Sequence, residues 1–383
     1  MNVAKKSSTQ NIVKGLLISS VIYFHAMTFV ALPNTESVLS DFNILLLLFP
    51  FLMMVFFFYT GYNYKPGKRT PWQNIKRRTL QLLIPFVATM LLSTAIIFAI
   101  RLPQGESLEA LWNGVLYFLM SQPLAMLINF PSNGIVSFDL ILALGILWFI
   151  YCLYVCSIFF FLIVDYAIKK PAILFSIITG LLILGFCLGQ FIGPSLPYSV
   201  QCYPVVLAIM LFAAYLKQFD FLDKKPESKK DIVFIVVNAI VAEAIIAGFG
   251  IFGYYAYGTT MVGALPGGRF DDALKGYDSF IAFFIGILGT YVAHQAARLI
   301  GLIPGVNFAF DWYGNHSSLV YLLHPICLTF IHRVLFRDKV VLGWFQPFLY
   351  VFISIAILVV LFIIIDLIIN AIKNKRTPKG DAA

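Results

Sequence analysis

A lysine and a histidine share one face of the first apolar segment, and both residue types can do chemistry. His25 follows Lys14 by eleven residues, with no charged residue between them. In a helix this spacing brings the two side chains to within ~20° of one face and ~16 Å apart along the axis. Lys14 then lies near a membrane surface, where it can bind an anion. His25 lies near the bilayer midplane, where an ionisable group costs ~3 kcal/mol and indicates function.

The composition indicates that this apolar segment lies in a membrane. Of 383 residues, 60% are hydrophobic and only 12% are charged, with a mean hydropathy of +0.89, which excludes a soluble globular domain. A helix that crosses a bilayer needs ~20 apolar residues. We therefore predict an all-α bundle of about ten transmembrane helices, within residues 12–32, 43–64, 79–101, 139–164, 172–192, 199–217, 232–254, 279–301, 315–336 and 346–372.

The basic residues predict the orientation of the bundle. The formal net charge is +9, which by itself would also suit a nucleic-acid-binding protein. Most of the lysines and arginines, however, fall in loops that share one side with the N-terminus. The other side collects only Arg101, Arg269, Lys275, Arg333, Arg337 and Lys339. This positive-inside pattern places both termini in the cytoplasm and accounts for the charge without a nucleic-acid partner.

One cytoplasmic loop is suited to bind an anion. Residues 65–78, KPGKRTPWQNIKRR, contain six basic residues and no acidic one. Together with Lys14, Arg77 and Arg78 at the end of this loop can hold phosphates through charge-assisted hydrogen bonds. The alternative is that the loop only fixes the topology and contacts anionic lipid headgroups.

Three further residues are candidates within the apolar segments. His324 is expected near mid-depth, and Pro325 after it frees the carbonyl of Tyr321 and opens the helix locally. His25 and His324 can therefore face one cavity. Glu243 is an intramembrane carboxylate that can bind an acceptor or transfer a proton. Trp148 is either a packing residue or part of an aromatic wall for a ligand.

The remaining features indicate one membrane domain. The five cysteines lie in or beside apolar segments without the spacing of metal ligands, so we expect core residues and no metal site. No repeat and no flexible linker divides the chain. We expect a single membrane-embedded domain over residues 1–383 with no appended soluble domain.

Five short sequence words occur in a fixed order along the apolar segments. They are NIVKGLLISSVIYFH at 11–25, FFFYTGY at 56–62, RRTLQLLIP at 77–85, LWFIYCLY at 147–154 and SSLVYLLHP at 317–325. In this order the chain resembles the acyltransferase-3 family of integral membrane acyltransferases. Three positions depart from the family pattern, because Lys14 replaces an arginine, Asn11 an acidic residue and Thr60 a serine. Lysine keeps the charge but loses the bidentate geometry of arginine.

The resemblance implies a reaction and its partners. Family members transfer an acyl group, commonly acetyl from cytoplasmic acetyl-CoA, to a hydroxyl of a cell-envelope glycan or lipid-linked sugar. In this chain the implied roles are donor binding by Lys14, Arg77 and Arg78 and catalysis by His25 and His324. The expected location is a bacterial cytoplasmic membrane, with its lipids as further partners.

Two other functions also suit these residues. In the first, the chain is a lipid-linked glycan flippase, a polymerase or a proton-coupled transporter, and His25, Glu243 and His324 form a relay. Transporters often have paired halves with broken helices at corresponding positions, and none is visible here. In the second, the chain is a non-catalytic scaffold of an envelope-assembly complex.

Overall fold

The structure is a computed structural model that describes residues 8–31, 52–120, 148–188, 200, 202–222, 229–257, 278–337 and 345–376. These residues form helices and turns and no strand. The helices are α1 (Thr9–Ala31), α3 (Leu52–Tyr62), α4 (Pro71–Arg78), α5 (Ile84–Arg101), α6 (Leu108–Met120), α9 (Trp148–Ala167), α10 (Pro171–Cys187), α11 (Tyr203–Lys217), α12 (Lys229–Tyr257), α13 (Asp278–Ile300), α14 (Val306–Asn315), α15 (Ser317–Phe330) and α16 (Gln346–Arg376), with π-helical turns η1 (Thr79–Leu83) and η5 (Ile331–Leu335).

The all-α prediction is confirmed over the described residues, and each predicted apolar segment contains one of these helices. Within the part of the chain that the structure describes, six helical stretches are long and apolar enough to cross a membrane. Their bounds are Pro71–Arg101, Phe149–Ala167, Lys230–Gly248, Ser279–Ile300, Ser317–Leu335 and Gln346–Ile364. Three shorter helices, α3, α10 and α11, are also apolar. A count of ten spans and the cytoplasmic placement of both ends remain predictions.

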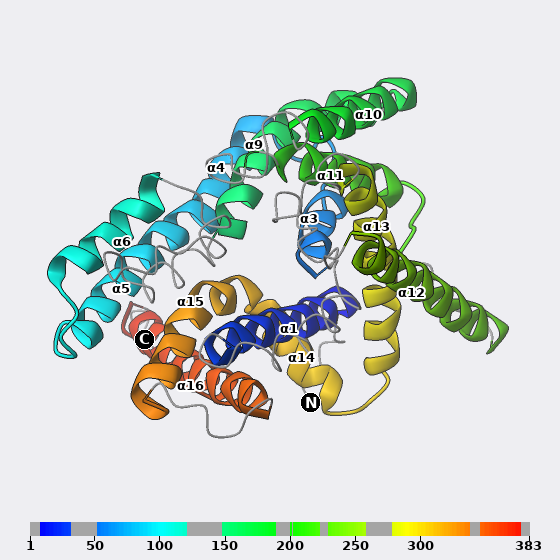
Figure 1. Cartoon of the computed structure of the whole chain (residues 1–383). Helices are drawn as coiled ribbons and strands as arrows, with labels where there is room; N and C mark the ends of the chain where they lie inside the picture. The colour runs from blue at the N-terminus through cyan, green and yellow to red at the C-terminus, as the bar shows by residue number, and fades with distance from the viewer. Residues whose placement is uncertain are drawn as a thin grey trace, which may run out of the picture.

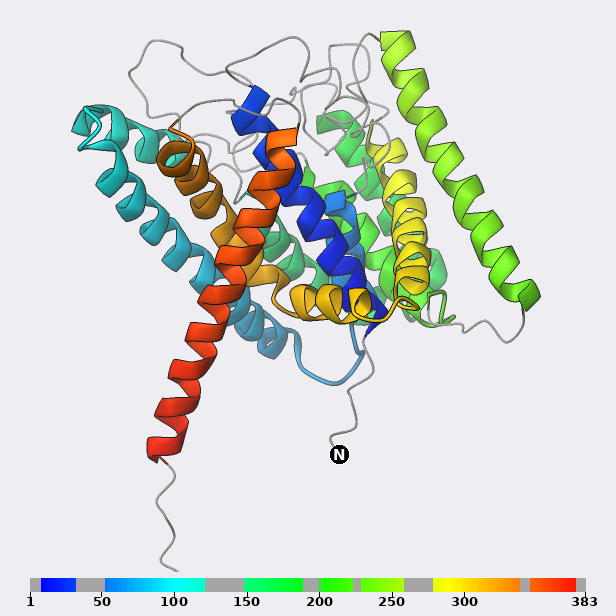
Figure 2. The ribbon, with the colours of Figure 1, turned by 90° about the horizontal axis from the view of Figure 1, so that it is seen from below.

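Helix α1 lies inside the bundle and is held mainly by α14 (Figures 1 and 2). Their backbones approach so closely that a Cβ atom at Gly15 would overlap the carbonyl oxygen of Phe310. A Cβ at Gly314 would likewise overlap the carbonyl oxygen of Asn11. Only glycine permits this approach, which lets two helices pack through their backbones. α1 also packs against α13, α15 and α16.

The basic loop continues into a rigid entry to α5. Thr70 caps α4 by accepting a hydrogen bond from the Gln73 backbone, and the Gln73 side chain accepts one from the Thr70 N–H. Pro71 occupies the first helical turn, so α4 has a well-defined start. The Thr79 hydroxyl in η1 is 3.0 Å from the Tyr154 hydroxyl of α9. These contacts fix the helix that carries Arg77 and Arg78.

Candidate active site

The two histidines that were expected at mid-depth meet inside the bundle. His25 of α1 and His324 of α15 stack with ring centroids 5.3 Å apart and an angle of 27° between planes. His324 is fully buried and His25 is half-buried. Residues almost 300 positions apart in the chain therefore form one imidazole pair.

The environment of His324 fixes its tautomer. Because Pro325 has no N–H, the Tyr321 carbonyl receives no helical hydrogen bond from it. The Nδ1 atom of His324 lies 2.7 Å from that carbonyl oxygen. A carbonyl only accepts, so Nδ1 carries the hydrogen and Nε2 keeps its lone pair. Nε2 is buried and has no hydrogen-bond partner among the described residues. A buried acceptor without a partner can take a proton from a bound substrate.

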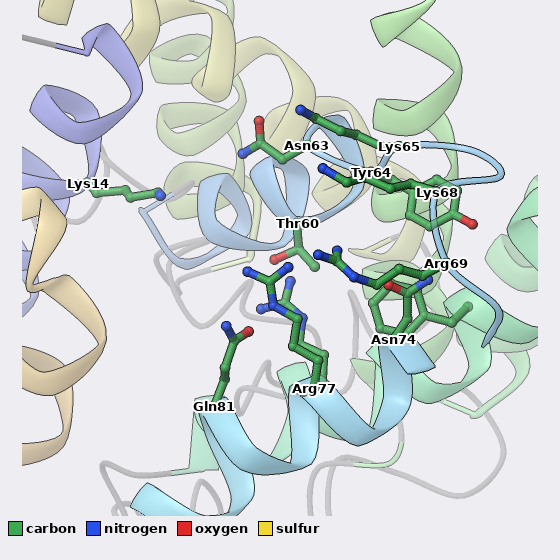
Figure 3. Close-up of a pocket in the computed structure, with 12 residues that line it drawn as sticks. Lys14, Thr60, Asn63, Tyr64, Lys65, Lys68, Arg69, Asn74, Arg77 and Gln81 are labelled. Carbon is green, nitrogen blue, oxygen red and sulfur yellow. The ribbon is translucent and has the colours of Figure 1, made fainter. Parts of the chain in front are cut away.

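A strongly basic cavity of about 520 Å³ opens beside Lys14 (Figure 3). Of the described residues that line it, six are basic and none is acidic. These residues are Lys14, Thr60, Asn63, Tyr64, Lys65, Lys68, Arg69, Asn74, Arg77, Arg78, Gln81 and Phe161. We call this the basic pocket. The three residues predicted to hold an anion, Lys14, Arg77 and Arg78, all line it. Its charge and size suit a polyanion rather than an isolated apolar ligand.

A neutral tyrosine also lines the basic pocket. Tyr64 follows α3, and its ring lies 5.3 Å from that of Phe160 and 6.0 Å from that of Phe161. Burial and the nearby carboxylate of Asp165 raise the pKa of Tyr64 well above its usual value. The phenol therefore stays protonated at neutral pH and does not reduce the positive charge of the pocket.

A smaller cavity of about 160 Å³ continues from the basic pocket into the bundle. We call it the inner pocket. It shares Lys14, Thr60, Asn63 and Arg78 with the basic pocket, and its other lining residues are Phe56, Tyr59, Leu82, Phe149, Ile150, Leu153, Ser317, Ser318 and Tyr321.

The inner pocket extends toward the histidine pair. The Tyr321 ring lies 5.2 Å from that of Phe149 and 5.4 Å from that of His324. The two pockets therefore lead from a charged opening to an aromatic wall whose Tyr321 contacts His324, although neither histidine is among the described lining residues. A ligand with an anionic head and a slender tail matches this order of surfaces.

Helix α14 positions Lys14 at the junction of the two pockets. The Asn11 side-chain amide donates to Asp311 Oδ1 at 3.1 Å and to Asn315 Oδ1 at 2.9 Å. The Ser8 N–H donates to the same Asp311 oxygen at 2.7 Å. A carboxylate at the first turn of α1 satisfies a backbone donor and complements the helix dipole. Lys14 lies one turn further along the helix that this network holds.

Two other predicted site residues, Glu243 and Trp148, are not among the described lining residues of the two pockets. Glu243 is half-buried on α12, which packs against α13 at the far edge of the bundle from α15 (Figures 1 and 2). Its Oε2 atom is buried without a hydrogen-bond partner among the described residues, but it lines neither pocket. Trp148 begins α9, and its side chain lies outside the described residues.

Several pocket residues were not among the predicted site residues. Thr60, Asn63, Ser317, Ser318 and Tyr321 line the inner pocket. Four of them lie in the FFFYTGY and SSLVYLLHP words, but nothing local distinguishes them from packing residues. Tyr59 also lines this pocket, and its hydroxyl lies 2.8 Å from Nδ1 of the buried His294.

The cysteines are free, four of them buried. Among the described residues, no group of three or more His, Cys, Asp or Glu side chains is placed to hold a metal ion.

Comparison with known proteins agrees with this architecture. A family model described as an acyltransferase domain, the acyltransferase-3 model, matches residues 11–366. The search of curated proteins gave no match, and neither did the search of solved structures. The match covers nearly the whole chain and includes both histidines and the basic loop. The chain therefore belongs to the acyltransferase-3 family of membrane acyltransferases.

Proposed function

We propose that this protein transfers an acetyl group from cytoplasmic acetyl-CoA to a hydroxyl of a cell-surface polysaccharide or lipid-linked sugar. The family supplies the reaction class. The observation that carries the proposal is that the basic pocket and the inner pocket share lining residues and that Tyr321 of the inner pocket contacts His324 of the histidine pair. We propose a bacterial cytoplasmic membrane as its location, with the basic pocket facing the cytoplasm.

Coenzyme A matches the two pockets in both charge and shape. Its phosphates would bind in the basic pocket, where six basic side chains can form charge-assisted hydrogen bonds. The uncharged pantetheine arm would enter the inner pocket past Thr60 and Phe149. This placement brings the thioester carbonyl toward Tyr321 and His324. Binding of the coenzyme A phosphates, away from the reacting atoms, would then hold the thioester in position.

The histidine pair supports two routes for the chemistry. In direct transfer, His324 Nε2 takes the proton of the acceptor hydroxyl while the oxygen attacks the thioester carbon. The carbon–sulfur bond breaks, and the leaving thiolate receives a proton. In the covalent route, a histidine nitrogen attacks the thioester carbon and the coenzyme A thiolate leaves. The acceptor oxygen then attacks the acyl-histidine, the histidine nitrogen leaves, and the other imidazole takes the proton of the acceptor hydroxyl. Both routes need one imidazole nitrogen that is unprotonated and has no hydrogen-bond partner, and Nε2 of His324 has none among the described residues.

The proposal is tested with the purified full chain in nanodiscs and radiolabelled acetyl-CoA. We expect coenzyme A release and transfer of label to at least one member of a panel of glycan and lipid-linked acceptors. Succinyl-CoA and a longer acyl-CoA in parallel reactions define the donor. If acetyl-CoA neither binds nor turns over while the protein moves a lipid-linked glycan between leaflets, the acyltransferase proposal is wrong and the transport alternative holds.

A further inference from the structure

The inner pocket has a second contact with a buried histidine, apart from the histidine pair. Tyr59 of α3 lines this pocket, and its hydroxyl lies 2.8 Å from Nδ1 of His294 on α13. The two rings lie 6.4 Å apart with an angle of 48° between their planes. Both side chains are buried, and His294 is not among the described lining residues of either pocket. Tyr59 therefore connects a buried imidazole to the inner pocket.

The sequence of α3 brings Tyr59 into this position. Four residues of α3 have the i, i+3, i+4, i+7 spacing of one helix face and line the inner pocket; they are Phe56, Tyr59, Thr60 and Asn63. Figure 3 shows Thr60 and Asn63 beside the basic side chains, because these two residues also line the basic pocket. α3 packs against α13, which carries His294 (Figure 1). One helix thus contacts both pockets and the buried imidazole.

The same helix sets the order in which a ligand meets these residues. Thr60 and Asn63 line both pockets, whereas Tyr59 and Phe56 line only the inner one. Phe56 lies roughly 4.5 Å beyond Tyr59 along the axis of α3. The Phe56 ring is 5.6 Å from that of Phe149. A slender chain that enters from the basic pocket therefore passes Tyr59 before it reaches the aromatic wall.

Transfer from acetyl-CoA would create a negative charge that the inner pocket is poorly suited to solvate. When the carbon–sulfur bond breaks, the sulfur leaves as a thiolate, on the side of the acyl carbon that faces the pocket opening. The apolar side chains that line this pocket are Phe56, Leu82, Phe149, Ile150 and Leu153. An unpaired charge in apolar surroundings is strongly disfavoured. A proton donor beside the sulfur therefore lowers the barrier.

Among the described lining residues, Tyr59 is the group best placed to donate this proton. A phenol is a far stronger acid than the serine and threonine hydroxyls of the lining, and the guanidinium of Arg78 does not give up its proton. The other phenol, Tyr321, lies further along the path against His324, where the acceptor loses its proton. Lys14 is the remaining donor, and the experiment below separates it from Tyr59.

His294 completes the donor group. A phenol has one hydrogen, so a Tyr59 hydroxyl that donates to sulfur can only accept from Nδ1 of His294. The imidazole tautomer with its hydrogen on Nδ1 makes this contact across 2.8 Å. As the proton moves to sulfur, the tyrosyl oxygen becomes negative and the hydrogen bond from Nδ1 strengthens. His294 is thus a positioning residue that acts through Tyr59.

We infer that Tyr59 is the general acid of the transfer and that it protonates the leaving sulfur of coenzyme A. The inference rests on the proposed acyltransferase function. In both routes the carbon–sulfur electron pair goes to sulfur, and the Tyr59 O–H bond supplies the proton. The tyrosinate regains a proton from water that enters through the basic pocket, and the imidazole that took the acceptor's proton releases it to water. Over one cycle the acceptor hydroxyl loses one proton and the sulfur gains one.

The test compares two acetyl donors whose leaving groups differ in their need for a proton. The first is acetyl-CoA, and the second is its selenium analogue, whose selenolate is a weaker base and leaves more readily as an anion. Single-turnover transfer is measured with the full chain in nanodiscs. Y59F should slow transfer from acetyl-CoA about 100-fold and transfer from the selenium analogue less than about threefold. Its Kd for acetyl-CoA should stay within about threefold of the wild-type value.

Three companion variants separate an acid from a structural role. H294A should slow transfer from acetyl-CoA about 10-fold, and H294N should recover most of this loss because its amide can donate from the place of Nδ1. Y62F is the matched control, since Tyr62 lies on the same helix and its hydroxyl accepts from the Leu222 N–H at 3.0 Å. Y62F should change the ratio of the two donor rates less than about twofold. If Y59F does not fold, H294A and H294N with the two donors decide the question.

Three outcomes would overturn the inference. Equal rates of transfer from acetyl-CoA by the wild type and folded Y59F remove the acid. Equal slowing of both donors by Y59F means that Tyr59 holds the donor and does not protonate sulfur. A difference between the donors that appears in K14M instead of Y59F assigns the proton to Lys14. If the wild type binds acetyl-CoA but neither transfers the acetyl group nor releases coenzyme A, the proposed function itself fails.

Discussion

Arg78 offers the sharpest test of the donor path because it lines both the basic and the inner pocket. It is half-buried, so its guanidinium is partly withdrawn from solvent. A charge-assisted hydrogen bond to a phosphate is worth about 1.5 to 3 kcal/mol. Loss of one such contact in R78Q should therefore raise the Kd for coenzyme A by about 10-fold to 150-fold.

Lys76 provides the matched control on the same helix. It carries the same charge as Arg78 but is exposed and lines neither pocket. K76Q removes one positive charge from α4 without removing a contact, and exposed charges contribute little at moderate salt. The Kd of K76Q for coenzyme A should stay within about threefold of the wild-type value.

Calorimetry of coenzyme A binding to the full chain in nanodiscs measures both effects. The Kd for coenzyme A should differ less between the wild type and R78Q at 1 M salt than at 0.1 M salt. The reason is that the Debye length falls from about 10 Å to about 3 Å. The donor path is wrong if R78Q and K76Q bind coenzyme A equally, or if both match the wild type at the lower salt.

Two further predictions concern helix packing and the inner pocket. Gly15→Ala should destabilise the protein by about 1 to 3 kcal/mol, because the added Cβ would overlap the Phe310 carbonyl. Gly180→Ala, at an open position of α10, should stabilise the protein by up to about 1 kcal/mol. Thermal unfolding in detergent checks the pair, and equal Tm shifts would argue against the close packing of α1 and α14. Ser318→Cys places a thiol in the inner pocket, so saturating acetyl-CoA should slow its reaction with a maleimide severalfold. An unchanged labelling rate would mean that the pantetheine arm does not occupy this pocket.

Some placements follow from strong local signals in the sequence. Lys14 and His25 lie on one helix whose face follows from spacing alone. The carbonyl freed by Pro325 follows from covalent chemistry, and the structure uses it to orient His324. Arg77 and Arg78 stood out because six basic residues without an acidic one are rare in so short a loop.

Features that depend on contacts between distant segments could not be predicted. Asp311 holds the start of α1 from a position 300 residues away, and a short amphipathic helix gives no sign of that role. Glu243 stood out as an intramembrane acid, yet its place on α12 is set by packing and not by its own chemistry. Arg333 and Arg337 counted only as minor exceptions to the charge asymmetry until the fold brought them to Gln104.

The central claim is that the histidine pair carries out the transfer. Its most direct test is a single-turnover reaction of the full chain with saturating radiolabelled acetyl-CoA and an acceptor, comparing H25A and H324A with H316A. His316 donates to the Trp312 carbonyl and stacks on Phe362, whereas His25 and His324 stack on each other, so it controls for loss of a histidine. We predict that H25A and H324A, folded and still able to bind coenzyme A, transfer label at least about 100-fold more slowly, while H316A remains close to the wild type. Transfer at the wild-type rate by either H25A or H324A would contradict the claim.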